Sequence, residues 1–195
     1  MNQRERVLGL LSDGRFHSGA ELGRALGIGR SAVWKHVRAV QKLGVDVFAV
    51  RGKGYRLASP IELLDLDTII QGLNPANAAT LRGVEVFFEI DSTNRYLVEH
   101  AANRRPWPWL CLAESQSAGK GRRGRHWVSP FGGNLYFSLL WRFESGADSL
   151  AGLSLVTGVA VAEAIRAMGV DHLGLKWPND LFHRGRKLGG MLIEL

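Results

Sequence analysis

The chain has 195 residues, a hydrophobic fraction of 46% and a formal net charge of +7, which suits one large or two small domains and excludes wholesale disorder. Its one cysteine, Cys111, excludes a disulfide framework and a Cys-x-x-Cys metal site, and it fits a reducing, cytoplasmic compartment. The N-terminus has no long apolar run and the longest apolar runs fall short of a bilayer span, so we expect no signal peptide and no membrane partner.

The net positive charge comes entirely from the first part of the chain. Residues 1–60 contain 11 Lys and Arg against 4 Asp and Glu, whereas residues 61–195 contain 14 of each. A basic module joined to a neutral one indicates an acidic partner for the basic module, and nucleic acid is the leading candidate. A basic surface that serves only solubility is the alternative.

Three short helices are predicted at the start of the chain. "RERVLGLL" forms the first, which ends before Gly14. Ser18 and Glu21 stand at the spacing of a capping box and begin the second helix. After the turn "GIGR", Ser31 is expected to cap the third helix over residues 32–43. The apolar side chains of this helix recur at helical spacing, at Val33, Val37, Val40 and Leu43.

The third helix and the segment after it predict a winged helix-turn-helix. Two helices joined by a glycine-containing turn form the helix-turn-helix, and two strand-like runs, "VDVFAV" and "YRL", flank "RGKG" as a wing. We expect the third helix to enter a major groove of DNA, with candidate base contacts from Ser31, Trp34 and Lys35. The phosphate contacts are expected from Arg30, Arg38, Arg51 and Lys53.

Two alternatives to DNA binding stay open for this module. A winged helix can serve only as a protein contact or a structural lid, and Trp34 can simply pack inside the fold. The module ends at "ASP", because Pro60 disfavours a helical backbone at Ser59. We therefore predict a winged-helix domain over residues 1–60 and a second domain over residues 61–195.

Five strands and two helices are predicted in the second domain. The strands cover residues 85–90, 109–114, 134–141, 172–177 and 187–195, and the helices follow "DSTN" and cover residues 150–168. Strands outnumber helices and often follow one another directly, so we expect an α+β domain with one mixed, mostly antiparallel sheet. Small residues at Gly152 and Gly158 predict close packing of the second helix on that sheet.

The segment "DSTN" connects a predicted strand to a predicted helix. Asp91, Ser92 and Thr93 can each cap that helix. The unpaired N–H groups of the first turn and the nearby hydroxyls suit a carbonyl, carboxylate or ureido oxygen of a bound molecule. An ordinary helix cap is the alternative, and it would be preferred if this segment stood alone.

The segment "ESQSAGKGRRGRHW" (114–127) has three glycines at G-x-G-x-x-G spacing. A dinucleotide fingerprint needs a helix directly after the third glycine, but here "RHWVSPFGGN" leads into a strand. A Walker A loop is excluded too, because Arg125 and His126 replace the Lys-Ser/Thr pair. The remaining interpretation is a flexible loop that holds an anion with backbone N–H groups and arginines, and a solvated basic loop is its alternative. The loop's cations are Lys120, Arg122, Arg123 and Arg125.

Two further strand ends carry charged side chains. In "LKWPNDLF" (175–182), Lys176 ends a strand, "PND" is a turn, and Asp180 is placed to meet a metal or a ribose. In "RGRKLGG" (184–190), a tight turn precedes Lys187 at the head of a strand. Each segment alone is compatible with ordinary surface charge. Together with the glycine loop, they gather cations at strand ends of a domain that has no net charge.

These segments, with "SPFGGNLYFSL" between them, resemble the biotin protein ligases in content and order. The winged helix in front is similar to that of the bifunctional members that also repress the biotin operon. The resemblance implies a class II synthetase-like domain that makes biotinyl-5'-AMP and pyrophosphate from biotin and ATP, and then biotinylates a lysine of a biotin carboxyl carrier protein. It further implies Mg²⁺, operator DNA, and a homodimer that forms on ligand binding through sheet edges, with "GGMLIEL" as a candidate edge.

The resemblance also implies roles for individual residues. Lys187 and Arg122 are expected to be catalytic. The biotin site is expected to comprise Ser92, Thr93, Asn94, Gln116, Lys120, Gly121, Arg122 and Lys187. The nucleotide site is expected to comprise Arg122, Arg125, Trp127, Lys176, Asn179 and Asp180, with Trp127 stacking on adenine and Asp180 near the metal.

The sequence departs from the family pattern at two points. Lys120 stands where many relatives have arginine, a change that keeps the charge but loses bidentate geometry. Relatives continue with a glycine- and asparagine-containing block and a small SH3-like barrel, which do not follow Leu195, so we expect a catalytic domain that is incomplete at its C-terminus. A ligand-sensing regulator without ligase activity is therefore the alternative function, and a lipoate or octanoyl ligase is a third.

Overall fold

The computed structural model describes residues 2–102, 106–144, 150 and 152–194. The chain forms two compact units: Met1–Gly119 with Val128–Leu140, and Lys120–Trp127 with Trp141–Leu195. Most of the glycine-rich loop therefore belongs to the second unit, although the strands on either side of it belong to the first. The domain boundary at residue 60 stays a prediction.

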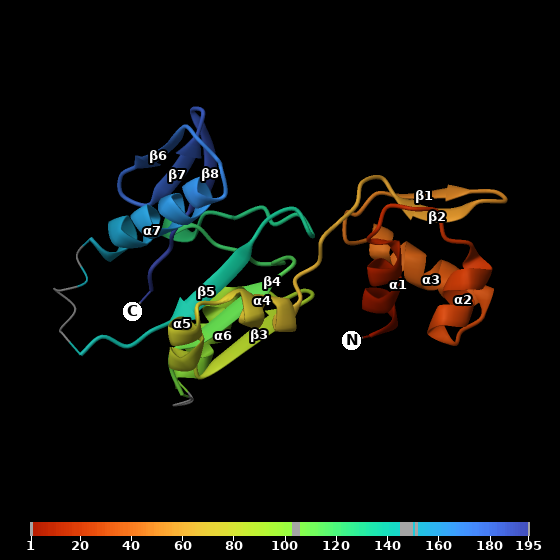
Figure 1. The fold of residues 1–195 in the computed structure, drawn as a ribbon, viewed down its shortest axis with the longest axis horizontal. Coiled ribbons are helices and arrows are strands. Elements are labelled where there is room, and N and C mark those ends of the chain that lie inside the picture. Colours follow the sequence, from red (N-terminus) through yellow and green to blue (C-terminus); the bar gives the residue numbers. More distant parts are fainter. Residues whose placement is uncertain (1, 103–105, 145–149, 151, 195) are drawn as a thin grey trace. The chain divides into compact units, whose positions relative to one another are not determined.

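The first unit begins with the predicted winged helix (Figure 1). Helices α1 (Gln3–Leu11), α2 (Gly19–Leu26) and α3 (Arg30–Gln41) precede the antiparallel hairpin of β1 (Val47–Val50) and β2 (Gly54–Leu57). The three predicted valines of α3 are fully or almost fully buried, and they pack against leucines of α1 and α2. The helix-turn-helix and the wing are thus confirmed, and burial of these apolar side chains is the main source of the module's stability.

The caps of α2 and α3 differ in kind. The capping box of α2 is confirmed, because Ser18 Oγ accepts the N–H of Glu21 and the Glu21 carboxylate accepts the N–H of Ser18. The prediction that Ser31 caps α3 was wrong. The extended backbone of Gly29 starts the helix two residues earlier, and its carbonyl accepts the N–H groups of Ala32 and Val33. Ser31 therefore lies inside the first turn with its side chain exposed.

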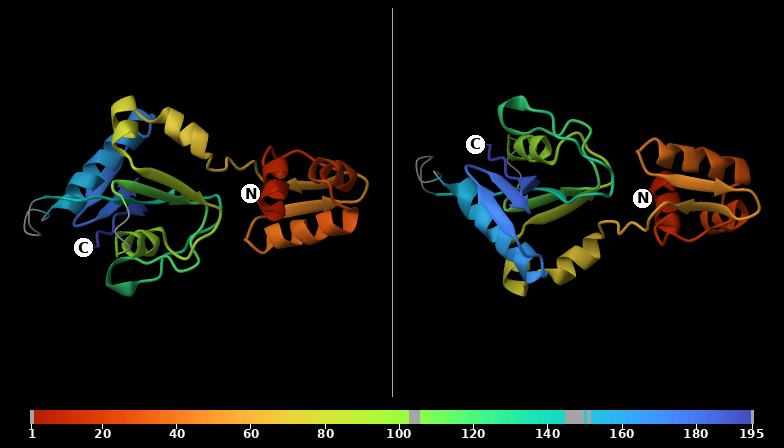
Figure 2. Two further views of the ribbon diagram at one scale, coloured as in Figure 1. Left: turned by 90° about the horizontal axis from the view of Figure 1, so that it is seen from below. Right: turned by 90° about the horizontal axis from the view of Figure 1, so that it is seen from above.

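The rest of the first unit is a three-stranded sheet with helices. The order of the strands is β3 (Gly83–Phe87), β4 (Trp109–Ala113) and β5 (Tyr136–Leu140), with β3 parallel and β5 antiparallel to β4. Helix α6 (Thr93–Ala102) packs on β4 and β5 (Figure 2). Two helices that we did not predict, α4 (Leu66–Gly72) and α5 (Pro75–Thr80), precede β3 and are capped by Asp65 and Asn74.

The second unit contains the short 3₁₀ turn η1 (Arg122–Gly124), helix α7 (Leu153–Ala167) and a second sheet. This sheet has the order β6 (Leu173–Lys176), β7 (Asp180–His183) and β8 (Arg186–Gly190), with both pairs antiparallel. The mostly antiparallel α+β class is confirmed. The described strands after the winged helix form two separate three-stranded sheets, however, and not the single sheet that we predicted. In the described part of the chain, no helix is both long and apolar enough to cross a membrane.

Three details of the second unit correct the sequence analysis. Strand β7 was missed, because its four residues begin at Asp180, the last residue of the turn that we predicted over "PND". Strand β8 ends at Gly190, although we expected the strand to continue to Leu195. Leu195 and Ala151, which belonged to the predicted strand and the predicted helix, lie outside the described residues. Gly158 does allow close packing, since a Cβ atom there would lie 2.8 Å from Met191 Cε. Gly152 instead provides the left-handed N-cap of α7, with no atom near its missing Cβ.

Candidate functional site

The exposed side of α3 carries the predicted DNA contacts. Ser31, Lys35 and the flanking Arg30 and Arg38 are all exposed, opposite the buried valines. Trp34 is 52% exposed, and the guanidinium of Arg38 lies 5.5 Å from the centre of its indole ring. The alternative in which Trp34 packs inside the fold is therefore wrong. The arrangement presents a flat aromatic surface and cations along a single helix face.

The wing adds cations beside this helix. Arg51 and Lys53 are exposed in the turn between β1 and β2, and the ammonium of Lys53 lies 5.8 Å from the centre of the Phe16 ring. Phe16 belongs to the connection between α1 and α2, so the wing is supported from that connection. In DNA-binding proteins, exposed arginine and lysine side chains like these supply sequence-independent contacts to phosphate.

The first residues of α6 form a buried polar group in the first unit. Ser92 and Thr93 are 7% and 3% exposed, and Asn94 is half-buried. Ser92 is the N-cap, because its Oγ accepts the N–H of Arg95 at 3.3 Å and its carbonyl accepts the N–H of Tyr96. Asp91 instead accepts the N–H of Ser92 and pairs with Arg95 at 2.9 Å.

Gln116 connects this helix start to the segment that follows β4. Its Oε1 accepts the backbone N–H of Thr93 at 2.9 Å and the Thr93 hydroxyl at 3.0 Å. The hydroxyl of Ser138, on β5, lies 2.9 Å from Thr93 Oγ1. We did not predict Ser138, although a single serine within the apolar run "LYFSLL" was a signal for a polar contact. The group offers amide and hydroxyl hydrogen bonds in a largely buried place.

Two titratable side chains in this part of the first unit have raised pKa values: Cys111 on β4, and Glu114 directly after β4. Burial raises the pKa of the Cys111 thiol to about 12, with a smaller contribution from the negative charge of Glu85. Burial also raises the pKa of Glu114, against the opposing effect of the Leu64 N–H that its carboxylate accepts. Glu114 therefore ties the segment that follows the winged helix to the end of β4.

The glycine loop folds back on itself in the second unit. Gly121 N–H donates to the carbonyl of Arg125 at 2.7 Å, and Lys120 and His126 form an isolated antiparallel bridge. Arg123 adopts a left-handed backbone with φ of 61°. This tight turn holds four cationic side chains in solvent, since Lys120, Arg122, Arg123 and Arg125 are all exposed.

The loop meets the turn between β6 and β7. Arg122 Nη1 donates to Asn179 Oδ1 at 3.3 Å, and Asn179 Nδ2 donates to the carbonyl of Met191 at 2.7 Å. The backbones of Asn179 and Met191 are also joined, at 2.9 Å. Asn179 is thus held on two sides, and it places the Arg122 guanidinium beside the start of β7.

Lys187 forms the second contact of this cluster. Its ammonium lies 2.7 Å from Asp180 Oδ1 and 5.2 Å from the centre of the Trp127 ring. Gly190 gives the pair room, because a Cβ atom there would lie 3.2 Å from Asp180 Oδ1 and 3.4 Å from Lys187 Nζ. The second unit therefore brings together five of the predicted residues: Arg122, Trp127, Asn179, Asp180 and Lys187.

Other predicted residues lie outside these contacts. Lys176 is the cross-strand neighbour of Asp180, but its ammonium lies over the ring of Phe182, at 5.6 Å. Lys120 and Arg125 are exposed, and the contacts found for them are those of the loop backbone. The residues predicted to bind biotin at the start of α6 and at Gln116 belong to the first unit, and the cluster around Lys187 belongs to the second.

The residues around Asp180 do not form a metal site by themselves. Among the described residues there is no group of three or more His, Cys, Asp and Glu side chains suited to a metal ion. The Asp180 carboxylate is engaged by Lys187. Magnesium is commonly held by one or two carboxylates together with substrate phosphates. We therefore assign no chemical step to a metal here.

Comparison with known proteins agrees with this arrangement. Residues 86–195 match the Biotin/lipoate A/B protein ligase family, and residues 3–56 match an HTH domain. The chain is 50% identical to the bifunctional ligase/repressor BirA of Salmonella typhimurium over 189 residues, which are 97% of this chain and 57% of that protein. It is 47% identical to the bifunctional ligase/repressor BirA of Escherichia coli over 190 residues, with the same two coverages.

A solved structure is similar as well. The biotin protein ligase from Aquifex aeolicus, in complex with biotin and ATP, matches with a TM-score of 0.51 and 36% identity, covering 59% of this chain and 47% of that one. The chain thus combines a winged helix-turn-helix with a domain of the biotin/lipoate ligase type. The chain belongs to the biotin/lipoate A/B protein ligase family. It spans little more than half the length of the curated relatives that it matches.

Proposed function

We propose that this protein activates biotin with ATP, giving biotinyl-5'-AMP and pyrophosphate, and then transfers the biotinyl group to a lysine of a biotin carboxyl carrier protein. Family membership and the relatives named bifunctional ligase/repressor support the reaction class. The observation that carries the proposal is the cluster of the second unit, in which Lys187 lies against both Asp180 and Trp127.

The chemistry requires positive charge at one place. A biotin carboxylate oxygen attacks the α-phosphorus of ATP, the bond to the β-phosphate oxygen breaks, and pyrophosphate leaves with that electron pair. Negative charge accumulates on the α-phosphate oxygens during this step. Lys187 and Arg122 supply fixed cations for that charge, and such groups act more strongly where a closed loop excludes water.

The remaining predicted residues would bind and orient the two substrates. In the first unit, Gln116 Oε1 is used by Thr93, which leaves its amide N–H groups to donate to the biotin head, alongside Ser92 and Asn94. In the second unit, Trp127 offers an aromatic face to adenine. Phosphate and ribose contacts are proposed for Arg122, Arg125, Lys176, Asn179 and Asp180, and biotin and adenylate contacts for Lys120 and Gly121.

Transfer completes the reaction. The neutral amine of the carrier lysine attacks the biotinyl carbonyl, AMP leaves from the mixed anhydride, and the amine loses its proton. Mg²⁺ would enter with the phosphates of ATP, near Asp180. Closure of the glycine loop over the adenylate would protect it from hydrolysis until the carrier arrives.

We also propose that the winged helix represses biotin genes in the cytoplasm. A basic module with an exposed recognition helix supports binding to operator DNA. The adenylate would order loops of the ligase domain and favour a homodimer, which would place two winged helices on a palindromic operator. Edge pairing of β8 is the proposed contact of the dimer.

A direct test is incubation of the purified chain with biotin and ATP, followed by mass spectrometry of the bound molecule. Biotinyl-5'-AMP in the wild type and its loss in Lys187→Gln are the expected results. Bound biotin without adenylate would select the ligand-sensing regulator, and a preference for lipoate in calorimetry would select the lipoate ligase. Addition of carrier protein then tests transfer separately.

A further inference from the structure

The wing has a third, short segment that aligns an arginine between two phenylalanines. His17 and Tyr55 exchange two backbone hydrogen bonds of 2.8 Å each, so residues 16–18 lie antiparallel to β2. The register of the hairpin sets Phe48 opposite Arg56. Antiparallel pairing continues this row to Phe16, next to His17. Phe16, Arg56 and Phe48 therefore share the face of the hairpin opposite to the buried Leu57.

The row is a stacked aromatic and cationic surface. The Arg56 guanidinium lies 5.1 Å from the ring centre of Phe16 and 5.4 Å from that of Phe48. Both rings are large and still exposed, by 37% and 48%. The Lys53 ammonium lies over the outer part of the same row, 5.8 Å from Phe16. Cation–π contacts of this kind hold a guanidinium plane in one orientation.

The charge of Arg56 is not neutralised within the described chain. Its Nε is buried without a hydrogen-bond partner, and no described carboxylate forms an ion pair with it. A guanidinium that is fixed in place and lacks an anion is an open site for a carboxylate or a phosphate. The rings of Phe16 and Phe48 orient the Arg56 side chain, a role that a carboxylate often has in other proteins.

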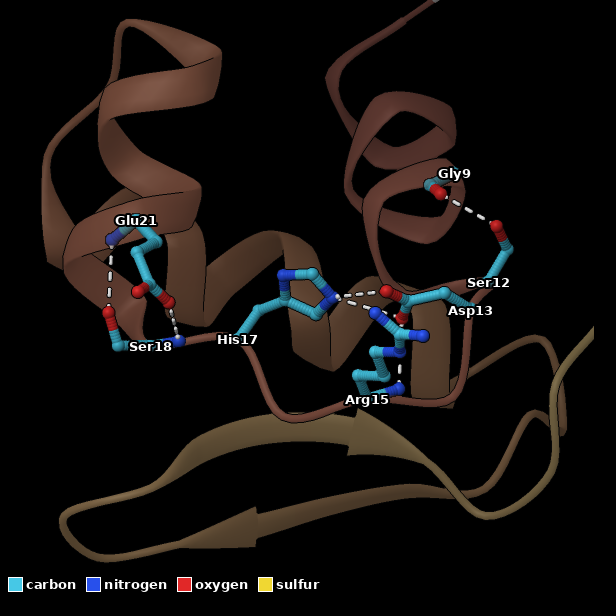
Figure 3. A network of polar contacts seen from close by, with 7 residues as sticks. All are labelled: Gly9, Ser12, Asp13, Arg15, His17, Ser18 and Glu21. Atoms are coloured by element: carbon cyan, nitrogen blue, oxygen red, sulfur yellow. Dashed lines mark hydrogen bonds and ion pairs between the residues drawn. The ribbon is translucent and has the colours of Figure 1, made fainter.

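The segment that carries Phe16 is itself held on both sides (Figure 3). Asp13 accepts the N–H of Arg15 at 2.9 Å and contacts His17 Nε2 at 3.0 Å, while Ser18 and Glu21 form the capping box of α2. The backbone bonds of His17 to β2 complete the support. The backbone at Phe16 is thus held in place, so the ring against which Arg56 stacks is positioned before any ligand binds.

We propose that the row Phe16–Arg56–Phe48 is a phosphate-binding surface of the winged helix, where Arg56 contacts the DNA backbone next to the wing turn. This proposal rests on the proposed DNA-binding function and adds a residue and a face to it. Charge favours DNA as the occupant, because the whole formal excess of +7 lies in residues 1–60. The row is also continuous with the exposed Lys53 of the wing turn, whose ammonium lies over the Phe16 ring.

Salt dependence of DNA binding measures the proposed contact directly. The full chain is titrated onto a fluorescent duplex of about 30 base pairs of arbitrary sequence, at salt concentrations from about 50 to about 200 mM. The slope of log K against log salt is negative, and each lost phosphate contact reduces its magnitude by about 0.9. We expect that loss for Arg56→Gln. Arg56→Lys keeps the charge but loses the bidentate geometry of the guanidinium. Its slope should equal that of the wild type, and its affinity should fall about threefold.

Matched variants separate this proposal from the function on which it rests. Lys42→Gln removes one exposed charge at the far end of α3, and it should leave the slope close to that of the wild type. Arg51→Gln tests the wing turn alone. An Arg56→Gln slope equal to that of Lys42→Gln, while Arg51→Gln loses one contact, overturns the proposal and leaves DNA binding intact. No binding by the wild type overturns both.

A protein partner on this face is the remaining outcome. If Arg56→Gln leaves the DNA slope unchanged but weakens the homodimer or carrier binding, the row serves a protein and the proposal is wrong. Phe48→Leu provides a second variant that keeps every charge. Loss of its ring should free Arg56 and weaken DNA binding about threefold without changing the slope. Melting temperatures equal to the wild type confirm that each variant is folded.

Discussion

Lys187 Nζ lies 2.7 Å from Asp180 Oδ1, and the same ammonium stands over the ring of Trp127. The two paired side chains are 42% and 26% exposed, so water screens their attraction. Ion pairs of this exposure contribute about 0–1 kcal/mol to stability. The pair is better explained as a means of holding the lysine in place at the head of β8.

Replacement of Lys187 by glutamine should therefore separate activity from stability. The neutral side chain cannot stabilise charge on the α-phosphate, so adenylate formation should fall by about 100- to 1,000-fold. The free energy of unfolding should change by less than about 1 kcal/mol. Biotin-dependent pyrophosphate exchange and urea unfolding measure the two effects. Loss of stability with the exchange rate unchanged would show that the pair is structural.

Gly190 should tolerate a methyl group less well than its neighbour Gly189. A Cβ atom at position 190 would lie 3.2 Å from Asp180 Oδ1 and 3.4 Å from Lys187 Nζ, whereas position 189 has no atom within 4 Å. Gly190→Ala should displace the ion pair and lower the exchange rate about tenfold, the effect expected of a small misplacement of a catalytic group. Gly189→Ala is the matched control and should keep the wild-type rate. Equal rates in both variants would count against a positional role of the pair.

Local signals in the sequence were enough to predict the winged helix. The capping box at Ser18 and the valine stripe of α3 are each determined by residues three or four positions apart, and both were correct. Ser31 has the chemistry of a cap, but Gly29 already supplies the required extended backbone. The choice between two candidate caps only two residues apart depends on the preceding turn, which residue type alone does not specify.

Tertiary contacts, rather than local patterns, limited prediction in the second domain. Strand β7 is only four residues long, and it is stabilised by neighbours on both sides, β6 and β8. The cations of the strand ends were identifiable from the sequence. The partners that fix them were not, because Asn179 meets Arg122 across 57 positions. Ser138 was missed for the same reason, since its partner Thr93 is 45 positions away.

Thr93→Val should disturb the proposed biotin site while keeping the shape of the side chain. The single Thr93 hydroxyl proton is used by Gln116, so Ser138 must donate to Thr93, and valine breaks both bonds. Thr93 is 3% exposed, so the unpaired groups should cost about 1–3 kcal/mol of stability. Calorimetry should show weaker biotin binding, because Gln116 loses the hydroxyl bond and is then held only by the backbone N–H of Thr93. Thr93→Ser keeps the hydroxyl and should bind normally; weakened binding there would contradict this account.

Glu114→Gln should alter the pH dependence of stability. Burial raises the pKa of Glu114 above its ordinary value of 4.5, so the folded state binds the proton more tightly than the unfolded state. The resulting stability is fully present below about pH 4.5 and is lost as pH rises through the folded pKa. Glutamine stays neutral and can still accept the Leu64 N–H.

The melting temperature of Glu114→Gln relative to the wild type should therefore increase from pH 4 toward pH 7. Differential scanning calorimetry at closely spaced pH values measures the trend. Other groups titrate equally in both proteins, so their contributions cancel in the difference. A difference that decreases with rising pH would mean that the folded pKa of Glu114 is lowered.

The thiol of Cys111 should be unreactive in the folded protein. Burial raises its pKa to about 12, so almost no thiolate, the reactive form, exists at pH 8. Its strand neighbour Glu85 accepts hydrogen bonds from Tyr96 and Trp109, which fixes a negative charge beside it. An aromatic disulfide reagent should modify the native chain only through transient opening of β4, and it should modify one thiol at once in denaturant. Biotin with ATP should slow the native reaction further, because ligands that bind only the folded state reduce opening. Since Cys111 is the only cysteine, fast labelling of the native chain can have no other origin, and it would show that β4 is accessible.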